Sequence, residues 1–105
     1  MVKSWVRTEQ DGPHNSHAGE LLSREFMEPL ELSLDDLARE LRMPVDHIQA
    51  VIDGARPMDG ELDLRLARYF RMSEGFFLRL QNSYELLETR RALNGELDRI
   101  VPRAA

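Results

Sequence analysis

The sequence has 105 residues, of which 14 are basic and 19 acidic, so its formal net charge at pH 7 is −5. This length predicts one domain with a single modest core, and a composition of 42% hydrophobic and 31% charged residues argues against global disorder. The absence of cysteine excludes disulfides and thiolate metal sites, and no apolar run is long enough to span a membrane. We therefore expect a soluble, cytoplasmic protein that does not associate with membranes.

The first part of the chain predicts an arm followed by one helix. Residues 1–16 are polar and lack apolar periodicity, so we expect a flexible N-terminal arm. A helix is expected over about residues 18–28, because Leu21, Leu22 and Phe26 share one face and Pro29 ends the pattern.

Two short helices separated by a tight turn are predicted in the middle of the chain. Ser33 is expected to cap the first of them, whose apolar face is formed by Leu34, Leu37, Ala38 and Leu41. Pro44 suits the first turn of the second, which stops at Gly54 and has the inner face Val45, Ile48, Val51 and Ile52. The small Ala38 stands where two such helices would cross. This pattern predicts a helix-turn-helix, with a plain helical bundle as the alternative.

Two further helices are predicted in the last third of the chain. One begins after the cap Asp59 and runs to about Phe70, with the inner face Leu62, Leu66, Tyr69 and Phe70. The other opens at Ser73–Glu74 and runs to Leu93, and residues 96–105 would add one more turn through Leu97 and Ile100. No strand pattern appears. The predicted fold class is therefore all-α: a five-helix bundle with a helix-turn-helix over residues 17–93, followed by a tail over residues 94–105.

Three separated segments carry a resemblance to a known family. HAGELLSREFMEPLELSLDDLAREL, LRLARYF and FFLRLQNSYEL, in this order within residues 17–87, resemble the HigA/VapI-like antitoxin branch of the Xre-type (Cro/C1-like, lambda repressor-like) helix-turn-helix proteins. The resemblance implies a DNA-binding homodimer that represses its own operon and neutralises a RelE-like mRNA-cleaving toxin. Family turns usually carry glycine where this chain has Glu31, Arg42 and Arg71, and each substitution would cost about 1 kcal/mol if the position adopts a positive φ.

The DNA contacts are expected on the outer face of the third helix and around its ends. Gln49 can pair bidentately with adenine, and Ala50 can meet a thymine methyl group. His47 can donate to guanine or to a phosphate, whereas Asp46 can accept from cytosine only where no phosphate repels it. The candidate DNA-binding residues are Ser33, Arg39, Pro44, Asp46, His47, Gln49, Ala50 and Arg56.

The charge of this segment opposes DNA binding. Nucleic-acid binders are usually basic, but residues 33–58 contain three arginines and five carboxylates, a net charge of −2. Leu34 also replaces the glutamine that the family commonly has after the capping residue. We therefore expect weaker affinity and a shallower salt dependence than in typical members. Two alternatives remain open on the same fold: a protein-interaction module that has lost DNA reading, and an orphan regulator without a toxin.

The last helix is expected to form a homodimer, because five helices of this length cannot bury every apolar face alone. The candidate interface consists of Phe77, Leu80, Tyr84 and Leu87. The three histidines are joined by no ordered carboxylate set, so neither a metal nor another cofactor is expected. The sequence contains no Gly-rich phosphate loop, nucleophile elbow or HExxH motif, so we do not expect an enzyme.

Overall fold

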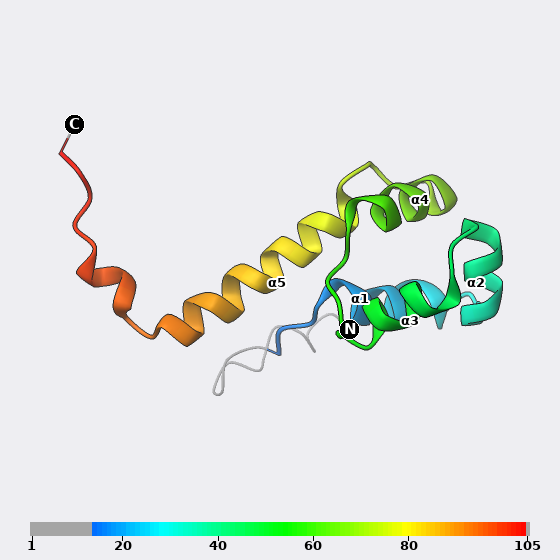
Figure 1. The fold of residues 1–105 in the computed structure, drawn as a ribbon, viewed down its shortest axis with the longest axis horizontal. Coiled ribbons are helices and arrows are strands. Elements are labelled where there is room, and N and C mark those ends of the chain that lie inside the picture. Colours follow the sequence, from blue (N-terminus) through cyan, green and yellow to red (C-terminus); the bar gives the residue numbers. More distant parts are fainter. Residues whose placement is uncertain (1–13, 105) are drawn as a thin grey trace.

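The computed structural model describes residues 14–104, so most of the expected N-terminal arm lies outside the described residues. Within them every regular element is a helix and there is no strand, which confirms the all-α prediction. Figure 1 shows the arrangement of the helices. In chain order they are α1 (Ala18–Leu21), η2 (Leu22–Met27), α2 (Leu34–Leu41), α3 (Val45–Ile52), α4 (Gly60–Phe70), α5 (Phe76–Leu93) and η3 (Glu96–Arg99).

The first helix occupies the expected residues but is not a regular α-helix. The Nδ1 atom of His17 accepts a hydrogen bond from the Glu20 N–H and so caps α1, after which the chain widens into the π-helical η2. Leu22 and Met27 are both buried although they lie five residues apart. The wider turn of a π-helix brings residues at this spacing nearer to one face than an α-helix does.

Helices α2 and α3 form the predicted helix-turn-helix. The Ser33 hydroxyl accepts a hydrogen bond from the Asp36 N–H at 3.0 Å, as expected of an N-cap, and Ala38 is buried where the two helices meet. Arg42 ends α2 with a φ of +59°, and Pro44 directly precedes α3. The inner-face expectation was wrong for Val45, which opens α3 and is 38% exposed, so the buried face begins one turn later. It was also wrong for Tyr69 near the end of α4, which is equally exposed.

The start of α5 is fixed by a residue that the sequence pattern did not single out. Asp63 of α4 is buried, and its carboxylate accepts hydrogen bonds from the backbone N–H groups of Gly75, Phe77 and Leu78 at 2.6, 2.8 and 3.1 Å. The helix therefore begins at Phe76 rather than at Ser73–Glu74. A buried carboxylate takes over the role that a capping side chain next to the helix usually has.

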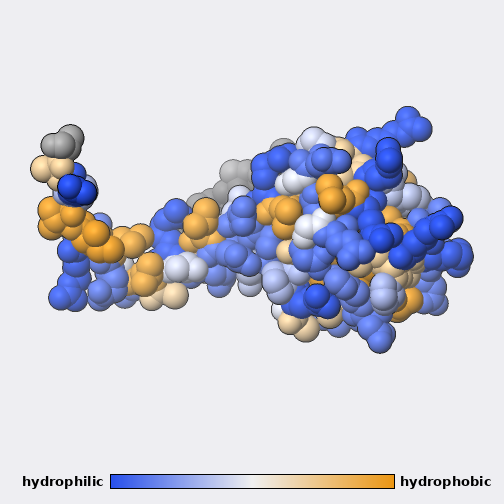
Figure 2. Space-filling view, turned by 45° about the horizontal axis from the view of Figure 1, so that its top comes forward, coloured by the Kyte–Doolittle hydropathy of each residue, from blue (hydrophilic) through white to orange (hydrophobic). Residues whose placement is uncertain are grey.

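The second half of α5 and η3 project away from the other helices (Figure 1). Leu80, Tyr84 and Leu87 are half-buried along α5, whereas Leu86 is 61% exposed. Apolar side chains gather at the tip of this projection in Figure 2, where Leu97, Ile100 and Val101 are exposed. Within residues 14–104, no helix combines the length and apolar character that a membrane crossing requires.

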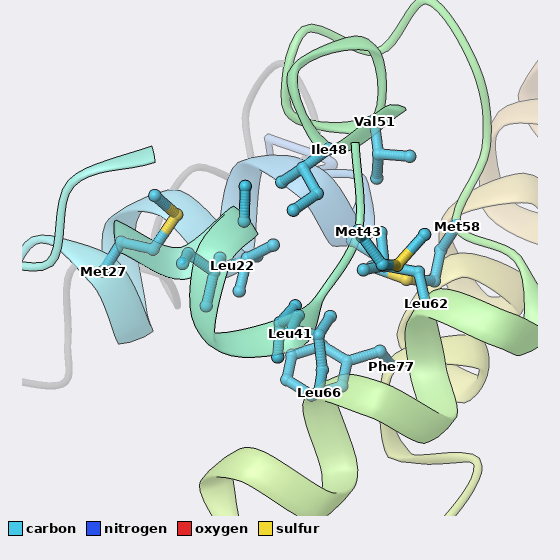
Figure 3. Packing of buried hydrophobic residues seen from close by; sticks show 13 residues of the cluster. Leu22, Met27, Leu41, Met43, Ile48, Val51, Met58, Leu62, Leu66 and Phe77 are labelled. Atoms are coloured by element: carbon cyan, nitrogen blue, oxygen red, sulfur yellow. The ribbon is translucent and has the colours of Figure 1, made fainter. Parts of the chain in front are cut away.

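The core lies between α1, α2, α3, α4 and the start of α5, and Figure 3 shows its side chains converging there. Phe77 is fully buried in this core, so the expectation that it lies in a dimer interface was wrong. Of the two adjacent aromatic residues, Phe77 fills the core, and Phe76 is only partly buried against it. Gly19 is required for close packing, because a Cβ there would overlap the Val51 carbonyl oxygen. This close contact between α1 and α3 holds the helix-turn-helix in position against the first helix.

Candidate nucleic-acid interface

The outer face of α3 presents its polar side chains as the sequence predicts. Asp46 and Gln49 are exposed, and Ala50 is half-buried. Gln49 Nε2 donates to Asp53 Oδ1 at 2.9 Å, one helical turn further on. This bond leaves the amide oxygen and one N–H of Gln49 available, and these are the two groups that bidentate pairing with adenine uses.

His47 does not lie where a base-reading residue would lie. Its Nε2 atom is 2.5 Å from Asp59 Oδ2, and only 18% of its side chain is exposed. The loop after α3 folds back and brings Asp59, the N-cap of α4, against the first turn of α3. The expectation that His47 reads a base is therefore replaced by a structural pairing between α3 and α4.

Asp59 both contacts His47 and caps the N-terminus of α4. Its Oδ1 atom accepts from the Leu62 N–H at 2.9 Å. Burial raises the pKa of Asp59, but the hydrogen bonds from the Leu62 N–H and from His47 outweigh it, and the net pKa lies below the usual value. The carboxylate is thus held in its charged form beside the loop that carries Arg56.

The two arginines expected to bind phosphates already have carboxylate neighbours. Arg39 Nη2 is 2.5 Å from Asp36 Oδ1, and this hydrogen bond, followed by that from Ser33, lowers the pKa of Asp36. Arg56 Nη2 lies 4.0 Å from Asp59 Oδ2, and 49% of its side chain remains exposed. Exposed ion pairs of this kind contribute little energy, so both guanidinium groups can exchange their carboxylate for a phosphate.

Around α3 the surface is therefore neutral to acidic. Arg39 and Arg56 are balanced by Asp36 and Asp59, and Asp46 adds an exposed negative charge. The Ser33 side chain is already engaged at the helix cap, because its oxygen accepts from the Asp36 N–H and its hydrogen bond with the Asp36 side chain helps to lower the pKa of that carboxyl. Pro44 is exposed at the edge of this face.

A concavity behind α3 connects the candidate interface to α5. It has a volume of about 380 Å³, and its lining includes Asp53, Arg56, His17, Gln81 and Tyr84. The rings of His17 and Tyr84 meet edge-on at 5.7 Å, and the Gln81 amide oxygen accepts from the Met58 N–H at 3.4 Å. Nowhere in residues 14–104 do three or more histidine or carboxylate side chains converge as metal ligands would.

Comparison with known sequences finds HTH-type transcriptional regulators and virulence-associated proteins, although no family model matches the chain. The uncharacterized HTH-type transcriptional regulator YbaQ of Escherichia coli is 34% identical over 70 residues, which are 67% of this chain and 62% of that protein. The match thus spans less than two thirds of that relative. Virulence-associated protein A of Dichelobacter nodosus is 31% identical over 71 residues, which are 67% of this chain and 70% of that protein.

Solved structures with the same fold include proteins bound to DNA. A Pseudomonas aeruginosa protein in complex with its 18-bp operator superposes with a TM-score of 0.81 and 29% identity, over 88% of this chain and 98% of that one. The Pseudomonas aeruginosa antitoxin HigA with the higBA promoter gives a TM-score of 0.77 and 26% identity, over 88% of this chain and 100% of that one.

Proposed function

Because the chain belongs to the HigA-like branch of the Xre-type helix-turn-helix proteins, we propose that it is a DNA-binding repressor and the antitoxin of a type II toxin–antitoxin module. The observation that carries the proposal is the exposed outer face of α3, with the amide of Gln49 turned to solvent, on a fold shared with operator-bound proteins. In this proposal α3 enters the major groove and the chain is not an enzyme.

The proposed contacts divide into base reading and phosphate binding. Gln49 reads an adenine, and Ala50 lies against a thymine methyl group at the same step. Ser33, Arg39 and Arg56 bind phosphates on either side of α3, which fixes its register without reading sequence. Pro44 and Asp46 border the groove at the start of α3, where the Asp46 carboxylate accepts from cytosine if no phosphate lies close enough to repel it.

A homodimer would place two copies of α3 on two half-sites. The half-buried Leu80, Tyr84 and Leu87 on the projecting α5 support such a contact, since a second copy of α5 would cover them. Two-fold pairing also doubles the phosphate contacts, which compensates for the few cations that each chain offers.

The proposed protein partner is a RelE-like mRNA-cleaving toxin encoded beside this chain. An orphan regulator on the same fold would lack it. A small basic open reading frame adjoining the gene, whose product co-purifies with this chain, supports the antitoxin role. Absence of such a neighbour favours the orphan regulator.

A second candidate function is a protein-interaction module without DNA reading. It is favoured by one observation: both arginines beside α3 are already paired with carboxylates. Fluorescence anisotropy with the duplex directly upstream of the gene, titrated at low and near-physiological salt, separates the two functions. Tighter binding than to scrambled duplex at both salts supports the repressor. Equal or absent binding by a folded dimer refutes it and favours the interaction module.

A further inference from the structure

Three arginines with free guanidinium groups lie around the ends of α2 and α4. Arg42 ends α2, Arg68 lies in the last turn of α4, and Arg71 ends α4. All three are exposed, and within residues 14–104 none of their guanidinium groups has a hydrogen bond or an ion pair. Arg65 differs, because it pairs with Glu61 and donates to the Leu41 carbonyl oxygen. We call Arg42, Arg68 and Arg71 the arginine surface.

Two concavities join these side chains into one continuous surface. The first has a volume of about 280 Å³ and is lined by Glu40, Leu41, Arg42, Arg65, Arg68 and Tyr69. The second has a volume of about 680 Å³ and is lined by Ala67, Arg68, Arg71, Met72 and Glu74. Arg68 belongs to both, so the arginine surface runs from the end of α2 across α4 without a break.

Two of the three arginines occupy strained backbone positions. Arg42 and Arg71 both have a φ of +59°, where glycine avoids a cost of about 1 kcal/mol. Strain that persists in this way is concentrated at functional sites. A positive φ alone does not mark this surface, because Glu31 has a φ of +53° and lines neither concavity. The distinguishing feature is that Arg42 and Arg71 both lie beside Arg68.

Arg68 and Arg71 of the arginine surface are separate from the candidate DNA interface, whereas Arg42 ends α2, two residues before Pro44. In Figure 1, α4 lies across the bundle from α3, and the buried core fills the space between them. A duplex held by α3 would therefore leave Arg68 and Arg71 open to a different partner.

We propose that the arginine surface docks a carboxylate-bearing segment of a partner protein, which goes beyond the function proposed above. Guanidinium groups bind carboxylates through paired hydrogen bonds. Arginine, tyrosine and methionine are enriched in protein interfaces, and the 38% exposed Tyr69 and the half-buried Met72 flank Arg68 here.

The charges nearby favour a protein over a nucleic acid as the occupant. Glu40 and Glu74 line the same two concavities as the arginines, so positive and negative groups alternate across the surface. Such alternation suits a protein segment with its own mixed charges, because it fixes the register of docking. It weakens attraction for a uniformly charged phosphate backbone, as does the net charge of −5 on the whole chain.

The test uses a double variant that removes the charges while relieving the strain. Arg42→Gly combined with Arg71→Gly should raise the melting temperature, so a loss of binding cannot be ascribed to unfolding. Glu31→Gly is the matched control, because it relieves the same strain outside the surface. The probe is a fluorescein-labelled peptide that contains glutamate, lysine and leucine with glutamate in excess, and its binding is followed by anisotropy. A single-stranded oligothymidylate is the second probe.

We expect saturable peptide binding by the wild type and by Glu31→Gly, and binding weaker by about tenfold or more in the more heat-stable double variant. The proposal is overturned if the wild type does not bind the peptide saturably, or if the double variant binds it as well as the wild type. It is also overturned if the double substitution weakens binding of the oligothymidylate but not of the peptide, which would identify a nucleic-acid surface.

Discussion

At the scale of single residues, Asp59 links the recognition helix to the rest of the bundle. One carboxylate oxygen caps α4 through the Leu62 N–H, and the other meets His47 of α3. Arg56 lies at 4.0 Å from the same carboxylate. The charge on Asp59 therefore affects both the stability of the α3–α4 connection and the position of an arginine that we propose binds phosphate.

Asp59→Asn should lower the free energy of unfolding by about 1 kcal/mol at neutral pH. Asparagine keeps the N-cap but removes the charge that attracts His47 and Arg56. Because the pKa of Asp59 is depressed in the folded protein, its charge stabilises the fold above the unfolded pKa of about 3.9, and this contribution is lost as the pH falls through the folded pKa. Urea unfolding over a pH series should show the two proteins converging below about pH 4. A difference that persists unchanged in strong acid would contradict this assignment.

Two substitutions on the DNA face should have effects of different kinds. Arg56→Ala should weaken binding to all duplexes and reduce the salt dependence, because a phosphate contact carries no sequence information. Gln49→Ala should relax preference at one base pair, costing about 1–3 kcal/mol on the preferred site only. Anisotropy with a set of single-base-pair operator variants separates the two. Equal loss on every duplex from Gln49→Ala would refute its reading role.

Around α3, the exposure of single residues was predictable from the sequence, but their tertiary contacts were not. The exposure of Gln49 and Asp46 follows from helical periodicity, which is a local property. The pairing of His47 with Asp59 does not, because it depends on a loop that brings together residues twelve positions apart. The positive φ of Glu31, Arg42 and Arg71 was predictable only from the resemblance to a family with glycine there.

At the scale of elements, the single buried carboxylate of Asp63 on α4 accepts three backbone hydrogen bonds from the start of α5, in addition to the apolar packing between the two helices. Asp63→Ala would leave the N–H groups of Gly75, Phe77 and Leu78 without their acceptor, at a cost of about 3 kcal/mol or more. We expect a matching loss of hydrogen-exchange protection at these amides and a lower free energy of unfolding. Asp35→Ala removes an exposed carboxylate and is the control, with an expected change within about 0.5 kcal/mol. Unchanged protection at the start of α5 in Asp63→Ala would show that the helix is held by its apolar contacts alone.

Helix boundaries were predictable from the sequence where a capping residue next to the helix sets them. They were not predictable where packing against other helices sets them. Ser33 and Asp59 accept hydrogen bonds from the first turns that follow them, and Asn94 ends α5 with a φ of +44°, as their chemistry predicts. The π-helical turn η2 and the burial of Phe77 in place of Phe76 depend on neighbouring helices. Apolar periodicity identifies a face but does not say which of two adjacent aromatic side chains fills the core.

At the scale of the whole molecule, charge and apolar surface are unevenly distributed. The arginine surface lies around the ends of α2 and α4, the face of α3 is neutral to acidic, and exposed apolar side chains extend along α5 to its tip (Figure 2). A single chain of this kind would bind DNA weakly. The proposed operator affinity therefore depends on pairing two chains, and the side of α5 that carries Leu80, Tyr84 and Leu87 is where that pairing would occur.

Leu87→Asp should convert the proposed dimer to a folded monomer. Leu80 packs against the core and Tyr84 meets the His17 ring, so changing either would also disturb the bundle, whereas Leu87 lies further out on the projection. Sedimentation equilibrium should give the monomer mass with unchanged helical circular dichroism, and operator affinity should fall because two half-sites would no longer be bound by one particle. Leu30→Asp, at a leucine that is 62% exposed away from α5, is the matched control and should remain dimeric. A folded Leu87→Asp variant that sediments as a dimer would place the pairing surface elsewhere on the chain.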